Sequence, residues 1–166
     1  NLASRVIAMV HRYFDGVLPA AGEYSDADLQ VQKIAKASVA DADEAIEKVA
    51  IHDAIGAVWT LVDELNNYIT VQEPWVLAKD EATRGRLATV LNTTIEGLRV
   101  LAVLLNPITP KATAKLWSAL GAGLGDLDNQ ILTEAATWSQ LPSGTALTAL
   151  EPLFPRIESD PTAESK

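Results

Sequence analysis

Apolar residues recur at intervals of three and four along most of the chain, and this spacing is typical of amphipathic helices. The pattern predicts five main helices, over about residues 1–15, 26–48, 51–72, 80–105 and 110–120. Their ends coincide with residue types that stop helices. Asp15-Gly16 follows the first, Pro74 limits the third, and Gly121 follows the last. The expected fold class is therefore all-α, a helical bundle.

The apolar face of each predicted helix indicates which side chains enter the core. The second helix has a thin, alanine-rich face that predicts an outer position: Leu29, Ile34, Ala37, Ala45, Ile46 and Val49. The third has a stronger stripe: Ile51, Ile55, Val58, Trp59, Val62, Leu65 and Ile69. The fourth is apolar on all sides in its last turns, so we expect it to lie deepest in the bundle.

The C-terminal part of the chain has no helical pattern. Two prolines flank a Leu-Phe pair in the segment Pro152-Leu153-Phe154-Pro155-Arg156-Ile157-Glu158. Such a segment docks as an extended strap, either on its own bundle or on a neighbouring domain. We expect one domain over residues 1–158, with the strap over about residues 140–158. Residues 159–166 are expected to form a disordered tail.

Composition supports this organisation and narrows the classes of function. At 166 residues the chain fits one domain, and 48% of its residues are apolar while only 5% are aromatic. Cysteine is absent, no apolar run reaches the ~18 residues that span a bilayer, and the N-terminus lacks a signal-peptide pattern. We therefore expect a cytoplasmic protein. The net charge of −9 argues against coating of nucleic acid by bulk electrostatics, although it permits local reading of a few exposed bases.

No catalytic or metal-binding constellation emerges from the residues. His11 and His52 are isolated, and neither has metal-ligand spacing. The glycine-rich run at 121–125 follows a helix rather than a strand and carries no basic residue, so it does not indicate a phosphate loop. The acidic residues Asp41, Asp43, Glu44 and Glu47 lie along one helix and are best explained as a solvated face. We expect no catalytic residue, metal site or cofactor in this chain.

Two polar or aromatic features are poorly explained by folding alone. Asn1, Arg5 and Arg12 lie within about 40° of one another on the first helix, either as a solvated face or as a set that reads base edges. Pro74-Trp75 places an indole in a connection between helices, where it either plugs the bundle or offers a stacking platform for an unpaired base. Lys79, with Arg84 and Arg86 after it, is a candidate for phosphate contact.

Taken in order, several segments of the chain resemble the C-terminal anticodon-binding domain of methionyl-tRNA synthetase, a class I aminoacyl-tRNA synthetase. The matching segments are Asn1-Leu2-Ala3-Ser4-Arg5, Arg12-Tyr13-Phe14-Asp15-Gly16, Asn67-Tyr68-Ile69, Pro74-Trp75-Val76-Leu77-Ala78-Lys79, Leu105-Asn106-Pro107-Ile108-Thr109-Pro110, Leu120-Gly121 and the proline-flanked strap. Each segment is a weak signal, but the ordered set is specific and extends from residue 1 to about residue 158.

The resemblance implies a role for each unexplained feature. In that family the residues that match Asn1 and Arg5 bond to anticodon bases, and the tryptophan that matches Trp75 stacks on the first base of the CAU anticodon. The adjoining proline, here Pro74, shapes the pocket. Arg12 and Lys79 are then the candidates for phosphate contact, and Trp75 is expected to be exposed.

The resemblance also implies partners. They are the anticodon loop of methionine tRNA and a catalytic domain of the parent chain, which uses ATP to join methionine to its tRNA; neither DNA nor a membrane is expected. The chain lacks that catalytic half and should be inactive alone. Two other interpretations stay open at this point: a helical protein-interaction module, and the anticodon domain of another class I synthetase.

Overall fold

The computed structural model describes residues 1–121 and 125–155, which form a helical bundle. Five main helices build it: α1 (Leu2–Phe14), α2 (Asp26–Glu47), α3 (Ile51–Gln72), α5 (Arg84–Leu105) and α6 (Pro110–Leu120). A single-turn helix, α4 (Pro74–Leu77), and three 3₁₀ turns, η1 (Glu81–Thr83), η2 (Leu127–Asn129) and η3 (Leu132–Glu134), complete the set. The described part of the chain has no β-strand, and the all-α prediction with five main helices is confirmed.

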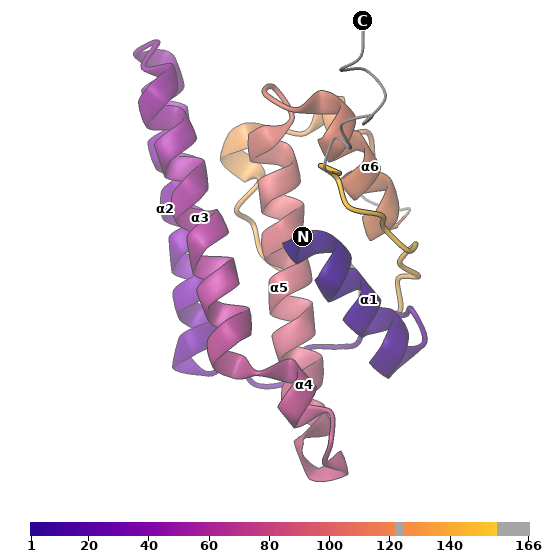
Figure 1. Ribbon diagram of the computed structural model, residues 1–166. Helices are drawn as coiled ribbons and strands as arrows, with labels where there is room; N and C mark the ends of the chain where they lie inside the picture. Colours follow the sequence, from indigo (N-terminus) through magenta and orange to yellow (C-terminus); the bar gives the residue numbers. More distant parts are fainter. Residues whose placement is uncertain (122–124, 156–166) are drawn as a thin grey trace, which may run out of the picture.

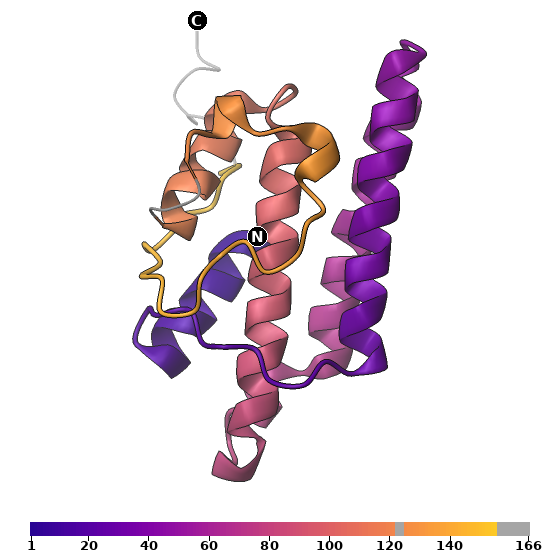
Figure 2. The same cartoon turned by 180° about the vertical axis from the view of Figure 1, so that it is seen from behind.

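Helix α5 is the centre of the bundle (Figure 1). The long helices α2 and α3 form a hairpin that packs along one side of α5, and the tip of this hairpin projects beyond the other helices. Helices α1 and α6 pack on the other side. Seen from behind, the segment after α6 crosses α5 and returns toward the loop that joins α1 to α2 (Figure 2). Every element that carries a candidate functional residue therefore rests on α5.

The burial of α5 follows from its composition. Its residues from Thr89 to Leu104 are all buried, in agreement with the predicted deep position. The stretch Glu81–Leu105 is long and apolar enough to pass as a membrane span by length and composition, but its apolar window is completely covered by the surrounding helices. Core helices of bundles pass the same test, so this property reflects the helix's place in the fold.

The predicted apolar faces of α2 and α3 need correction. Leu29 and Ile46 of α2 are exposed, as are Val49 in the turn after it and Ile51 and Trp59 of α3. The buried face of α2 is instead made largely of small or polar residues: Asp28, Val31, Ala35, Ser38, Val39, Ala42 and Ala45. In α3 the buried residues are Ala54, Val58, Leu61, Leu65, Tyr68 and Ile69. The predicted stripe in α3 is thus confirmed at Val58, Leu65 and Ile69 and wrong at Ile51 and Trp59, and the outer position of α2 holds.

The segment after α6 is fixed to the bundle by backbone hydrogen bonds and by a buried ion pair. Leu18 N donates to Thr145 O at 2.9 Å, and Leu147 N donates to Gly16 O at 2.8 Å. Arg99 Nε donates to Glu96 Oε2 at 2.9 Å, while Glu96 Oε1 accepts from Leu141 N at 2.6 Å. The strap is thus docked on its own bundle up to Leu153, which packs on the core. Residues 122–124 and 156–166, which include the end of the strap and the predicted tail, lie outside the described residues.

Candidate nucleic-acid interface

The predicted polar edge of α1 is present and faces solvent. Asn1 is the N-cap of α1, and its carbonyl accepts from Arg5 N at 3.1 Å, while its side chain makes no capping bond. Arg5, one turn further on, and Arg12, two turns beyond that, are exposed. The guanidinium of Arg12 lies 5.6 Å from the centre of the Tyr13 ring. The amide of Asn1 and the guanidinium of Arg5 therefore stand one turn apart on the same exposed side of the helix.

Trp75 is held by a sharp turn between α3 and α4. Glu73 ends α3 in the left-handed conformation, with φ 45° and ψ 58°, and redirects the chain. Pro74 occupies the first position of α4, where its fixed φ suits a helix start and its missing N–H costs nothing. Pro74 is buried, whereas Trp75 is 39% exposed. The turn thus has a buried anchor and presents part of the indole to solvent.

The segment after α4 returns directly to α5. Thr83 Oγ1 donates to Leu77 O at 2.7 Å, which ties the end of α4 to the turn that precedes α5. Lys79 follows α4 and is exposed. Trp75 and Lys79 therefore belong to one short excursion of the chain that is fixed to α5 at its far end.

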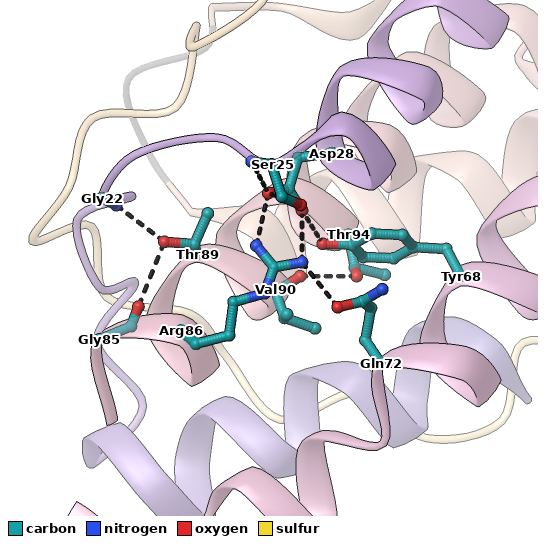
Figure 3. Close-up of polar contacts among 10 residues, drawn as sticks. All are labelled: Gly22, Ser25, Asp28, Tyr68, Gln72, Gly85, Arg86, Thr89, Val90 and Thr94. Carbon is teal, nitrogen blue, oxygen red and sulfur yellow. Dashed lines mark hydrogen bonds and ion pairs between the residues drawn. The ribbon is translucent and has the colours of Figure 1, made fainter. Parts of the chain in front are cut away.

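A buried polar group lies at the near end of this excursion (Figure 3). We call it the Asp28 cluster, made of Ser25, Asp28, Tyr68, Gln72 and Arg86. Asp28 is fully buried and accepts from Ser25 N at 2.7 Å, from Arg86 at both of its oxygens, and from the Tyr68 hydroxyl. Arg86 also donates to Gln72 Oε1 at 2.7 Å. The cluster joins the start of α2, the end of α3 and the start of α5.

The electrostatics of the Asp28 cluster favour the ionised carboxylate. Burial alone would raise the pKa of Asp28, but hydrogen bonds from Arg86, Tyr68 and Ser25 outweigh burial and hold the pKa below its usual value. Burial and the neighbouring Asp28 carboxylate raise the pKa of Tyr68, so that its hydroxyl remains a donor. The bond to Asp28 raises the pKa of Arg86, against the opposing effect of its burial. The cluster is therefore a satisfied ion pair at neutral pH.

Arg84 and Arg86, which follow Lys79 in the sequence, both have partners within the domain. Arg86 is engaged in the Asp28 cluster. The guanidinium of Arg84 lies 4.9 Å from the centre of the Phe14 ring and donates to Tyr13 O at 3.1 Å. Both arginines thus hold α5 to other helices: Arg86 to α2 and α3, and Arg84 to the end of α1.

The sequence-predicted residues form two groups on the bundle. Asn1, Arg5 and Arg12 lie together on α1, while Pro74, Trp75 and Lys79 lie in and just after α4. Both helices pack on α5, and Arg84 links the start of α5 to the end of α1 (Figure 1). The Asp28 cluster was not predicted from the sequence. Two partners of Asp28, Tyr68 and Arg86, lie 40 and 58 residues later in the chain, so no local pattern indicates it.

The exposed side chains of these two groups are of types that proteins use to contact bases. Within residues 1–121 and 125–155, no group of three His, Cys, Asp or Glu side chains could hold a metal ion. His52 is exposed beside Asp53, and His11 is half-buried against Gly16. An exposed indole, an amide and guanidinium groups are side chains that stack on bases and bond to their edges.

Comparison with known proteins identifies the family. A profile of the anticodon-binding domain of methionyl-tRNA ligase matches residues 18–166. The chain belongs to this family. It is 48% identical over 168 residues to the methionine–tRNA ligase of Streptomyces coelicolor, covering 98% of this chain and 31% of that protein. It is 36% identical to the enzyme of Caldanaerobacter subterraneus, covering 95% of this chain and 24% of that protein.

Solved structures give the same answer. The free form of Mycobacterium tuberculosis methionyl-tRNA synthetase matches 96% of this chain and 32% of its own length, with 34% identity and a TM-score of 0.85. The same synthetase bound by methionyl-adenylate matches 93% of this chain and 30% of its own length, with 35% identity and a TM-score of 0.83. This anticodon-binding domain therefore spans about a third or less of the relatives that it matches. The family match extends from α2 to the C-terminus and includes α4, whereas α1 precedes it.

Proposed function

We propose that this domain recognises the CAU anticodon of methionine tRNA as part of a methionyl-tRNA synthetase. Trp75 stacks on the first anticodon base, and Asn1 and Arg5 bond to base edges. Arg12 and Lys79 contact phosphates. The rest of the synthetase, which corresponds to the two thirds of the relatives that this chain does not match, holds the catalytic centre. There ATP is consumed to activate methionine, and the relative from M. tuberculosis binds methionyl-adenylate. The synthetase acts in the cytoplasm.

One observation carries the proposal: Trp75 is partly exposed on a turn whose neighbour Pro74 is buried. An indole that only plugged the bundle would be buried, as Trp117 is in α6. Partial exposure leaves some of the Trp75 ring accessible for stacking, and the buried Pro74 beside it fixes its place in the chain. Stacking of an unpaired base on such a ring contributes roughly 1–3 kcal/mol.

The proposal is tested with fluorescently labelled anticodon stem-loops in binding titrations. One loop carries CAU, and a second differs only in its first base. The unmodified domain should bind the CAU loop more tightly. Trp75→Ala should weaken CAU binding by roughly 5- to 150-fold, since it removes about 1–3 kcal/mol of stacking.

Trp59→Ala is the matched control for this experiment. Trp59 is the more exposed indole, at 55%, and lies in the middle of α3, away from α4. Trp59→Ala should leave the affinities for both loops unchanged. Equal binding of the two loops by the unmodified domain would contradict recognition of CAU, and equal losses in the two variants would indicate nonspecific aromatic contact.

A further inference from the structure

The Asp28 cluster lies directly before the turn that carries Trp75. Gln72 is the last residue of α3, Glu73 makes the turn, and Pro74 begins α4. Figure 3 shows the Arg86 guanidinium between the Asp28 carboxylate and the side chain of Gln72. The side chain that ends α3 is thus bonded to a guanidinium that is itself fixed by a buried carboxylate.

Helix α4 cannot orient Trp75 by its own stability. It has four residues, and a helix of a single turn does not persist in water without outside support. Its packing on α5 is supplemented by hydrogen bonds at its two flanks. Arg86 holds Gln72 on one side, and Thr83 Oγ1 holds Leu77 O on the other. Arg86 lies in the first turn of α5, and Thr83 lies in the 3₁₀ turn before it.

The bonds of Arg86 are directional in a way that apolar packing is not. Its two terminal nitrogens donate to the two oxygens of Asp28, which fixes the plane of the guanidinium. The second nitrogen, 3.0 Å from Asp28 Oδ1, also donates to Gln72 Oε1 at 2.7 Å. Because the guanidinium plane is fixed, its bond to Gln72 favours one orientation of the last residue of α3. The turn that follows Gln72 is therefore oriented as well.

We propose that Arg86 and Gln72 are positioning residues for Trp75, which hold the turn so that the indole meets its base in a single orientation and thereby set the preference for that base. The inference rests on the proposed anticodon recognition and deepens it. Arg86 and Gln72 touch no RNA in this account. They act through the turn, in the manner of side chains that support a binding residue from behind.

A second ion pair, Glu96–Arg99, lies further along α5 and provides a comparison. As a pair, Glu96 and Arg99 are more completely buried than Asp28 and Arg86, and they hold Leu141 N and the carbonyls of Ala135 and Thr137, in the segment after α6. Helix α5 thus contributes to two ion pairs, and each is bonded to a different part of the chain outside α5. The pair near the start of α5, Asp28–Arg86, is bonded to the residue before the turn that carries Trp75.

The test is the ratio of affinities for the CAU loop and the loop changed at its first base. Gln72→Ala removes the acceptor from Arg86 and leaves the ion pair with Asp28 in place. It should lower the ratio roughly three- to tenfold. Gln72→Glu restores an acceptor oxygen to Arg86 and should restore the ratio, even if its added charge weakens both affinities together.

Asn106→Ala is the matched control. Asn106 is also half-buried and donates to Asp128 Oδ1 at 2.9 Å, but it follows the opposite end of α5. It should leave the ratio unchanged whatever its effect on melting temperature. An unchanged ratio in Gln72→Ala, with the preference still abolished by Trp75→Ala, would overturn the positioning role and leave the proposed function standing. Absence of any CAU preference in the unmodified domain would overturn both.

Discussion

Asp28 is a carboxylate without solvent contact, and its charge is retained because every oxygen has partners. Ser25, Tyr68 and Arg86 all donate to it. Its removal would leave Arg86 without its counter-charge. Breaking a fully buried pair in this way costs about 3–5 kcal/mol. Because the Arg86 side chain is 26% exposed, we expect a smaller loss of roughly 2–3 kcal/mol for Asp28→Asn at pH 7.

The lowered pKa of Asp28 also predicts the pH dependence of stability. A carboxyl group whose pKa is lower in the folded chain contributes stability above its usual value, near 3.8, and this contribution is lost as pH falls through the folded pKa. Urea unfolding of the unmodified domain should therefore show a decline below about pH 4. Asp28→Asn should flatten this decline, whereas the exposed control Asp41→Asn should change stability at pH 7 by less than ~0.5 kcal/mol. Parallel acid profiles for the two variants would contradict the assignment.

The roles of individual cations could not be predicted from the sequence. Lys79, Arg84 and Arg86 follow Trp75 closely and were equivalent as candidates for phosphate contact. The difference arises from residues distant in the chain: Asp28 engages Arg86, and the Phe14 ring engages Arg84. Exposure of Trp75 was expected from family resemblance and not from periodicity, which left the buried and exposed alternatives equally open.

Most helix boundaries were predictable from the sequence, but α5 begins at Arg84, after a 3₁₀ turn, and not at residue 80. The buried faces of the helices were harder to predict. Ser25, Glu73-Pro74 and Thr109-Pro110 act locally, through capping and proline sterics, so the ends of α2, α3 and α6 agree with expectation. The face of α2 depends on its neighbours. Small side chains allow α2 to approach α3 and α5. The predicted face included Ala45, which is buried, together with Leu29 and Ile46, which are exposed.

The contact between α3 and α5 depends on a glycine. A Cβ at Gly97 would lie 2.5 Å from Leu65 Cδ2, and Leu65 is completely buried. Overpacking costs about 1–3 kcal/mol, while Gly→Ala inside a helix gains up to about 1 kcal/mol. Gly97→Ala should therefore destabilise the domain by roughly 1 kcal/mol in urea unfolding. Gly56→Ala should stabilise the domain, because the added Cβ meets nothing within 4 Å. A stabilising effect of Gly97→Ala would contradict the prediction and show that α3 shifts freely on α5.

For the whole molecule, part of the net charge of −9 lies far from the proposed RNA contacts. Asp41, Asp43, Glu44 and Glu47 lie near the tip of the α2–α3 hairpin, whereas Trp75 follows the other end of α3. At 1.5 Å per residue, the 22 residues of α3 place these ends about 33 Å apart. This distance is several times the ~8 Å screening length at physiological salt. The composition determines the net charge, but the distance between these four acidic residues and Trp75 is known only from the fold.

The charges near Trp75 predict a shallow dependence of RNA binding on salt. Lys79 is flanked by Glu73, Asp80 and Glu81, so few cations are free to meet phosphates there. If Arg12 and Lys79 are the phosphate contacts, log Kd should rise with log salt concentration with a slope of about 1.4, at ~0.7 per contact to single-stranded RNA. Lys79→Gln should lower the slope by about 0.7, and Lys111→Gln on α6 should not change it. Titration of the CAU stem-loop between 50 and 200 mM KCl measures the slope. A slope above about 4 would require a phosphate-binding surface that α1 and α4 do not supply, and would shift the search for RNA contacts to the lysines of α2 and α6.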